Sequence, residues 1–369
     1  METVRKLSLC FLIFALTAGL VPLSAAKNDV TPQIKSEIDR LQESLKAKPI
    51  TDKDAIQIAA MADGALKAAS AAISSGQLYL ALEQLGRAED LLHAARRMDD
   101  KAEVEKGGLP AFQAQWNKVS LQLTAFDKEA HSQTWTGSPL AVRALAEAAD
   151  GKAIPLLEGG QGFATATGPK DGLLYVGQAE GEADFARFCA ALKFSGQSPA
   201  VPVRSLLPEL QNLQDKTNAA FQPPQSIDLH SRFIALNSQL KLAQELDASK
   251  FYAGALYAYL EAARHFGMLK MEPLDAAQQA ALKQDIGALR TKLASSTNDE
   301  SMAELFLQRA ESYVSHPDGS APTADEWRGA RVILDQVLPA YYAALKPAAP
   351  LKQANGKTVE ITLVRWPYT

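Results

Sequence analysis

The chain has 369 residues, which is enough for two ordinary domains or one long repeat array. Hydrophobic residues make up 47% of it and charged residues 22%, a balance that excludes a disordered or collagen-like chain. The formal net charge is −4, whereas nucleic-acid binding normally requires a basic surplus to contact phosphates. We therefore expect no nucleic-acid partner.

The N-terminus is typical of a cleavable export signal. Arg5 and Lys6 precede an apolar run over residues 7–20, and small residues (Ser-Ala-Ala) follow at 24–26. The run is shorter than the roughly 20 residues that a membrane-spanning helix needs, although an uncleaved anchor is the alternative. We expect residues 1–26 to be removed, leaving a periplasmic or secreted protein without an integral membrane segment.

Removal of the signal would leave one cysteine. Cys10 lies within the signal, so Cys189 would have no partner for an intramolecular disulfide. Cys189 follows Phe185 and Phe188 in an apolar stretch, which predicts a buried, unreactive thiol. The sequence contains no cysteine spacing for zinc or c-type haem, and we expect no cofactor.

The rest of the chain is predicted to be mostly helical, because alanine is abundant and β-branched clusters are scarce. Apolar residues recur every three or four positions and thereby mark one face of each helix, as at Ile34, Ile38, Leu41 and Leu45. The expected helices lie near 32–47, 52–74, 77–97, 110–130, 139–149, 173–193, 204–221, 227–247, 250–269, 274–295, 299–315 and 324–345.

Helix starts are indicated by the spacing of a capping box, in which a hydroxyl and a carboxylate three residues apart satisfy free backbone amides. The spacing occurs three times, in Thr51 with Asp54, Thr297 with Glu300, and Thr323 with Glu326. Pro339 is expected to kink the last helix.

Residues 150–171 contain clustered glycines, which predict a surface loop or small hairpin. This loop-rich insertion would separate an N-terminal helical domain (27–149) from a C-terminal one (172–346). A phosphate-binding loop is disfavoured because the stretch lacks the Gly-Lys-Ser/Thr ending. Shortly after it, Gly177 and Gly181 are predicted to let two helices cross closely.

The C-terminus is expected to differ from the helical body. Residues 347–356 read as a linker, and residues 357–369 as a strand or tail because β-branched residues alternate there. Val359, Ile361 and Leu363 would share one face. The strand would either fold back onto the chain or pair with a partner by strand addition.

Two segments 174 residues apart, 66–88 and 240–262, resemble each other, and each is predicted to form a helical hairpin. Their small and apolar residues also resemble the pattern of a tetratricopeptide repeat. The resemblance is carried by Gly76, Leu78, Ala81, Leu82, Leu85 and Ala88, and again by Tyr252, Ala255, Leu256, Tyr259 and Ala262. It implies a scaffold of helical hairpins whose concave face binds peptides or proteins.

Few residues suggest catalysis. Glu89 with His93 and Glu261 with His265 are four apart, a spacing that fits helix-surface pairing better than a metal site. The best functional candidate is an aromatic surface on one predicted helix, although these side chains could equally be core residues. Its members are Phe251, Tyr252, Tyr257, Tyr259 and Phe266.

We therefore expect an all-α fold of antiparallel helical hairpins, arranged as an irregular solenoid or as two packed bundles, with a C-terminal strand. The expected function is that of an exported, non-catalytic helical-repeat protein that binds a protein or peptide partner in the cell envelope. The alternative is a hydrolase or small-ligand-binding protein whose site lies under the 150–171 insertion.

Overall fold

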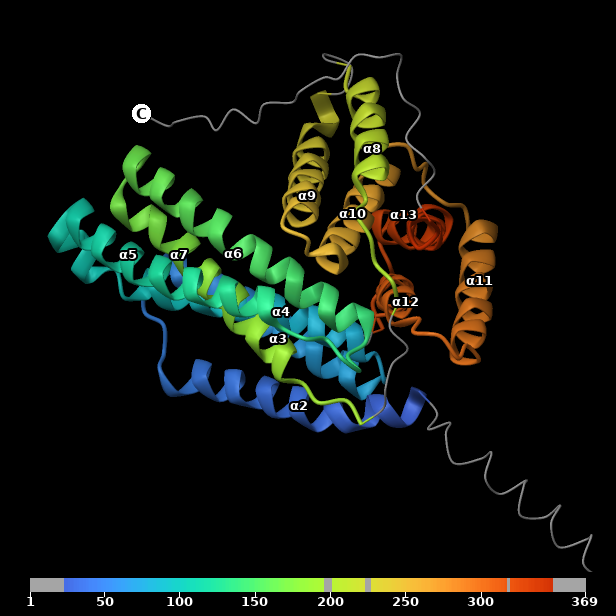
Figure 1. Cartoon of the computed structure of the whole chain (residues 1–369), viewed down its shortest axis with the longest axis horizontal. Coiled ribbons are helices and arrows are strands. Elements are labelled where there is room, and N and C mark those ends of the chain that lie inside the picture. The colour runs from blue at the N-terminus through green and yellow to red at the C-terminus, as the bar shows by residue number, and fades with distance from the viewer. Residues whose placement is uncertain (1–22, 196–200, 223–226, 317–318, 348–369) are drawn as a thin grey trace, which may run out of the picture.

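The computed structural model describes residues 23–195, 201–222, 227–316 and 319–347, and all regular elements within these ranges are helices (Figure 1). The predicted all-α class is confirmed. The predicted strand with Val359, Ile361 and Leu363 lies outside the described residues, as does most of the predicted signal. In the part that is described, no helix is both long and apolar enough to cross a bilayer.

The first group of helices forms a bundle in which α7 packs against α4, α5 and α6, while α2 packs across α3 and α4 (Figure 1). The predicted apolar stripe of α2 is buried, with Ile34 and Ile38 at its centre. The members are α2 (Leu23–Ala47), α3 (Lys53–Ser74), α4 (Leu78–Asp99), α5 (Ala102–Ser132), which is interrupted at Gly108, α6 (Leu140–Ala166) and α7 (Pro169–Ala191).

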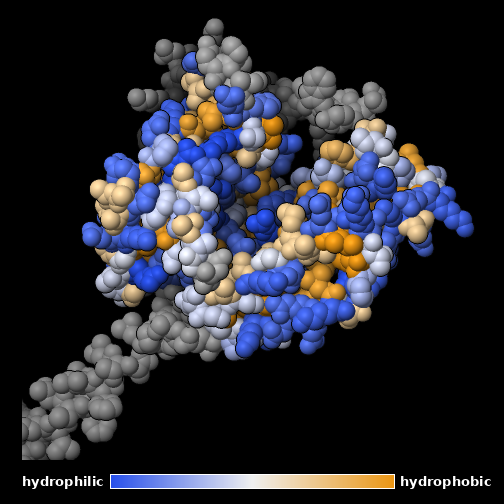
Figure 2. Space-filling view, turned by 180° about the vertical axis from the view of Figure 1, so that it is seen from behind, coloured by the Kyte–Doolittle hydropathy of each residue, from blue (hydrophilic) through white to orange (hydrophobic). Residues whose placement is uncertain are grey.

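The second group packs around α10 and contacts the first group through α6 and α4. Seen from behind, the surface is hollowed between the two groups, and hydrophilic side chains surround the hollow (Figure 2). The members are α8 (Leu207–Ala220), η1 (Ile227–Leu229), α9 (His230–Ala248), α10 (Tyr252–Met268), α11 (Ala276–Ala294), α12 (Ser301–Val314), α13 (Ala324–Val332), η2 (Ile333–Val337) and α14 (Leu338–Ala344). The π-helical turn η2 directly precedes the turn that holds Pro339.

The predicted loop at 150–171 is wrong, because α6 continues to Ala166 and α7 begins at Pro169. Gly160 and Gly172 serve packing instead of chain reversal, whereas Gly168, with a φ of 142°, lies in the turn between the two helices. A Cβ on Gly160 would lie 2.9 Å from the carbonyl oxygen of Gly172, and one on Gly172 would lie 2.5 Å from that of Gly160. These glycines let α6 and α7 approach closely, so the domain boundaries predicted at 149 and 172 fall inside helices.

The close crossing predicted for Gly177 and Gly181 is confirmed. A Cβ at Gly177 would lie 2.5 Å from the carbonyl oxygen of His93, and one at Gly181 would lie 2.6 Å from the Cα of Asp90. Because backbone atoms of α4 fill the space where side chains would be, α7 lies directly on α4.

The two segments 174 residues apart both form helical hairpins, and their turns have matching geometry. Gly76 and Lys250, which occupy the same position in the two segments, have φ values of 72° and 65°. The next residues, Gln77 and Phe251, each donate a backbone hydrogen bond to the carbonyl five residues earlier, at 2.8 and 2.9 Å. This is the hydrogen bond of a Schellman motif, and it returns the chain antiparallel in both hairpins.

Only one of the three predicted capping boxes forms, at Thr323 and Glu326. Helix α3 is capped by Asp52 rather than Thr51, because the Asp52 carboxylate accepts from the first free amides. Helix α12 begins at Ser301 without a capping side chain at Glu300. A capping box that the sequence analysis missed joins Asp275 and Gln278 at the start of α11.

We predict that Ala81→Leu and Ala255→Leu each lower the free energy of unfolding by about 1–3 kcal/mol, the usual cost of overpacking a filled core. Both alanines are completely buried, at 0% exposure. Denaturant unfolding measures the effect, and Ala68→Leu on the exposed face of α3 is the matched control. Equal stability of the core variants and the control would contradict close packing at these positions.

Candidate ligand-binding site

The five aromatic residues predicted as a partner surface do not lie together on one exposed face. Phe251 and Tyr257 are buried, and Tyr252, Tyr259 and Phe266 are partly buried. The Tyr257 hydroxyl donates a 2.6 Å hydrogen bond to Glu83 on α4. Only Phe251 lines the pocket described next.

This pocket, which we call the aromatic pocket, has a volume of about 320 Å³ and lies between α5, α6, α7 and the start of α10. Its size falls in the range of sites for small molecules or single side chains. Alanines of α6 and α7 form part of its wall. Its aromatic lining residues are Phe126, Trp135 and Phe251, and its polar ones are Glu129, Gln133, Glu147, Asp150 and Arg187.

Asp150 is the unusual group of the aromatic pocket. It is 5% exposed, and its Oδ2 atom has no hydrogen-bond partner among the described residues. Burial, and then the negative charge of Asp127, raise the pKa of the Asp150 carboxyl to about 7, although His131 and Arg187 oppose the rise. Burying a polar atom without a hydrogen-bond partner costs free energy, and this cost applies to the Oδ2 atom of Asp150.

Two other charged groups of the pocket wall, Glu147 and Arg187, are already engaged. Glu147 accepts from Arg143 at 2.6 Å with one oxygen and from the backbone N–H of Gly254 at 2.9 Å with the other. Arg187 donates to Asp184 at 2.6 Å, and its guanidinium lies 4.5 Å from the centroid of the Phe126 ring. Asp150 is therefore the buried group that is left for a ligand.

Trp135 reaches the pocket from the connection between α5 and α6. Gly137, with a φ of 79°, permits the tight turn of this connection, and the Ser138 N–H donates to the Trp135 carbonyl at 3.3 Å. Trp135 is only partly buried and lines the pocket. An aromatic side chain on a short connection between rigid helices can contact a ligand without moving the scaffold.

A second cavity of about 320 Å³ lies between α4, α6, α7, α10 and α12, and we call it the polar cleft. Arg309 is 7% exposed there and forms ion pairs with both Glu83 and Glu261. Burial alone would raise the pKa of Glu261, but Arg309 and Arg264 outweigh it and hold the pKa at about 2. These buried charges satisfy one another, which is the expected pattern for a structural ion-pair network.

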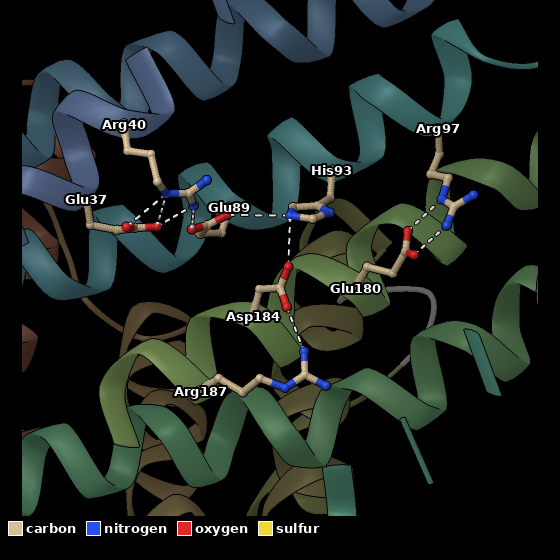
Figure 3. Close-up of polar contacts among 8 residues, drawn as sticks. All are labelled: Glu37, Arg40, Glu89, His93, Arg97, Glu180, Asp184 and Arg187. Atoms are coloured by element: carbon tan, nitrogen blue, oxygen red, sulfur yellow. Dashed lines mark hydrogen bonds and ion pairs between the residues drawn. The ribbon is translucent and has the colours of Figure 1, made fainter. Parts of the chain in front are cut away.

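A third polar group links α2, α4 and α7 (Figure 3). Arg40 pairs with Glu37 and lies 3.2 Å from an oxygen of Glu89, while the Nε2 of His93 lies 3.3 Å from Asp184. Glu89 is 1% exposed, and burial together with a hydrogen bond to Glu37 raises its pKa to about 8. The raised pKa favours the protonated form of Glu89, which can donate a hydrogen bond to Glu37.

The described residues offer few groups for thiol chemistry or metal binding. Cys189 is 1% exposed, and burial raises the pKa of its thiol, which confirms the predicted unreactive cysteine. No group of three or more His, Cys, Asp or Glu side chains is placed to hold a metal within the described ranges. The Glu89–His93 pair that the sequence analysis singled out forms a side-chain contact, with 3.6 Å between Nε2 of His93 and Oε2 of Glu89.

Comparison with known proteins leaves the site to be interpreted from its own geometry. No family model, curated protein or solved structure matches the chain. The resemblance to tetratricopeptide repeats therefore stays a prediction.

The sequence analysis missed Asp150 and Trp135 as site residues. One signal was available, since Glu147 and Asp150 lie three apart within the otherwise alanine-rich start of α6. Acids at that spacing share a helix face, and the face is buried. Trp135 gave no such signal, because its position depends on how the connection between α5 and α6 turns.

We predict that the free energy of unfolding falls as pH rises from about 5 to 8, because Glu89 keeps a proton in the folded chain that the unfolded chain releases near its ordinary pKa of 4.5. One such group contributes at most about 1.4 kcal/mol per pH unit. Glu89→Gln should make the fall shallower, since it removes this proton, while the raised pKa values of Asp90 and Asp150 keep part of the slope.

Chemical denaturation at a series of pH values measures this slope. Glu43→Gln, at an exposed position of α2, is the control and should keep the wild-type slope. A Glu89→Gln protein with the same slope as the control would show that Glu89 is ionised in the folded chain.

Proposed function

We propose that this chain is an exported, non-catalytic helical protein that binds a segment of a protein or peptide partner in the cell envelope. The aromatic pocket would receive that segment. The observation that carries the proposal is Asp150, a buried carboxyl with an unpartnered oxygen, set among aromatic side chains in an open pocket. Aromatic residues around a polar anchor are typical of sites where binding energy concentrates.

A helical-hairpin scaffold related to tetratricopeptide repeats is part of this proposal. The matching turns at Gly76 and Lys250 support it, because equivalent positions adopt the same uncommon backbone conformation. Each hairpin also packs a completely buried alanine, Ala81 or Ala255, against its neighbours. Hairpins of this kind build concave surfaces that suit extended ligands.

Small-ligand binding is the second candidate function, since the aromatic pocket has the volume of a small-molecule site and Asp150 begins the 150–171 segment where such a site was expected. The hydrolase alternative is less favoured by this pocket. Its lining contains no serine, threonine, cysteine or histidine, so a hydroxyl or thiol nucleophile activated by histidine cannot be built from these side chains.

We predict that the exported protein begins at Lys27, since the order of basic, apolar and small residues places cleavage after Ala26. Such a cut would leave Val30 and Ile34, which are buried core residues of α2, in the mature chain. N-terminal sequencing of the exported protein tests this. Recovery of an intact N-terminus in the membrane fraction would replace secretion with anchoring.

We predict that a photo-crosslinking residue at Gln133, which lines the aromatic pocket, captures a defined partner in cells. The same residue at Leu121, which is 75% exposed on α5, serves as the control and should not. Asp150→Asn combined with the Gln133 crosslinker should weaken the adduct. Identical adducts from both positions, or none from Gln133, would contradict partner binding in this pocket.

A further inference from the structure

We propose that the aromatic pocket recognises a protonated primary amine on an aliphatic stem, the side chain of a lysine in the peptide partner. This inference rests on the proposed function and specifies the chemistry of the ligand. The evidence is the placement of a buried carboxyl, Asp150, whose Oδ2 atom has no hydrogen-bond partner among the described residues, in a pocket lined by aromatic side chains.

The charge of the lining favours a cation. Three acids, Glu129, Glu147 and Asp150, line the pocket with one base, Arg187. The charges of Glu147 and Arg187 are balanced by their partners, whereas Glu129 is exposed and Asp150 is buried and forms no ion pair among the described residues. An anionic ligand would meet both of these carboxyls and be repelled.

The aromatic rings favour a cation as well. The Arg187 guanidinium already lies against the Phe126 ring, as expected from the attraction between a cation and an aromatic face. Trp135, the residue type with the strongest such attraction, lines the same pocket together with Phe251. The alanines of the wall would contact the aliphatic stem of a lysine, so one side chain could use both parts of the site.

A neutral ligand would satisfy the pocket less well. An apolar side chain of the same length would fill the space and leave the Asp150 Oδ2 atom buried without a partner. An ammonium group has three donors and can give one to this oxygen while it neutralises the carboxylate. The pocket should therefore distinguish lysine from an uncharged side chain of equal length.

The binding should also depend on pH, because an ammonium ion prefers ionised Asp150. The charged groups that face Asp150 are Asp127, Glu129 and His131 on α5, Glu147 on α6 and Arg187 on α7; α10 contributes the uncharged Phe251. With the pKa of Asp150 raised to about 7, affinity for the amine should increase between pH 6 and pH 8.

Two probes test the proposal on the full mature chain. One is Nα-acetyl-lysine methylamide, whose side-chain amine is free, and the other is its norleucine analogue, which has the same four-carbon stem without the amine. Titration followed by NMR signals of Trp135 measures both affinities. We expect the lysine probe to bind at least about tenfold more tightly at pH 8 and to lose affinity at pH 6. Asp150→Asn should abolish both the preference for the lysine probe and its dependence on pH. Asp215→Asn, at an exposed site on α8, should preserve both.

Equal binding of the two probes, or a preference that survives in Asp150→Asn, would overturn amine recognition and leave partner binding by the pocket intact. Circular dichroism verifies that the variant folds. If it does not, the pH dependence of the wild-type affinity decides, and a flat profile overturns the proposal.

A third probe, n-pentylammonium, should bind more weakly than the lysine probe; equal affinity would overturn the assignment to a peptide. The proposed function itself is tested separately, by comparing the adducts of the Gln133 and Leu121 crosslinkers.

Discussion

The arrangement of the two groups of helices depends on Arg309, a buried cation held by carboxylates from two other helices. Glu83 comes from α4 and Glu261 from α10, and Arg309 itself lies on α12. Removing a charge from water is costly, and the cost is recovered only when its partners stay in place. Any sliding of α12 against α4 or α10 would leave a charge unpaired in the interior, so this ion-pair network favours the observed register of the three helices.

Helix N-termini in this protein are often satisfied by side chains from other helices. Gln308 on α12 accepts from the backbone N–H groups of Tyr79 and Leu80, both at 3.0 Å, near the start of α4. Asp299 accepts from the N–H of Leu140 at 2.7 Å, at the first residue of α6. Free amides at a helix start must be paired. Here the pairing also joins α12 to α4 and the start of α12 to α6, so helix capping and tertiary packing reinforce each other.

The aromatic pocket is a consequence of the same kind of contact. Glu147 accepts from the N–H of Gly254 and thereby holds the start of α10 against α6. Phe251, which immediately precedes α10, is then fixed as a wall of the pocket. Glu147 has both oxygens engaged. Asp150, one turn further along α6, is the buried acid of the pocket whose Oδ2 atom has no hydrogen-bond partner among the described residues.

The sequence by itself determined the helices, because their signals are local: apolar residues at helical spacing, alanine-rich composition, and small residues where helices cross closely, as at Gly177 and Gly181. It also predicted the paired hairpins around Ala81 and Ala255. Only the tertiary structure decided that Gly160 belongs inside a helix, since the reason is the carbonyl of Gly172 on a neighbouring helix. It alone decided that the Oδ2 atom of Asp150 is buried without a hydrogen-bond partner among the described residues and that Tyr257 contacts Glu83. Helix formation follows from interactions within a few residues, whereas the environment of a charged or aromatic side chain is determined by residues that are distant in the sequence.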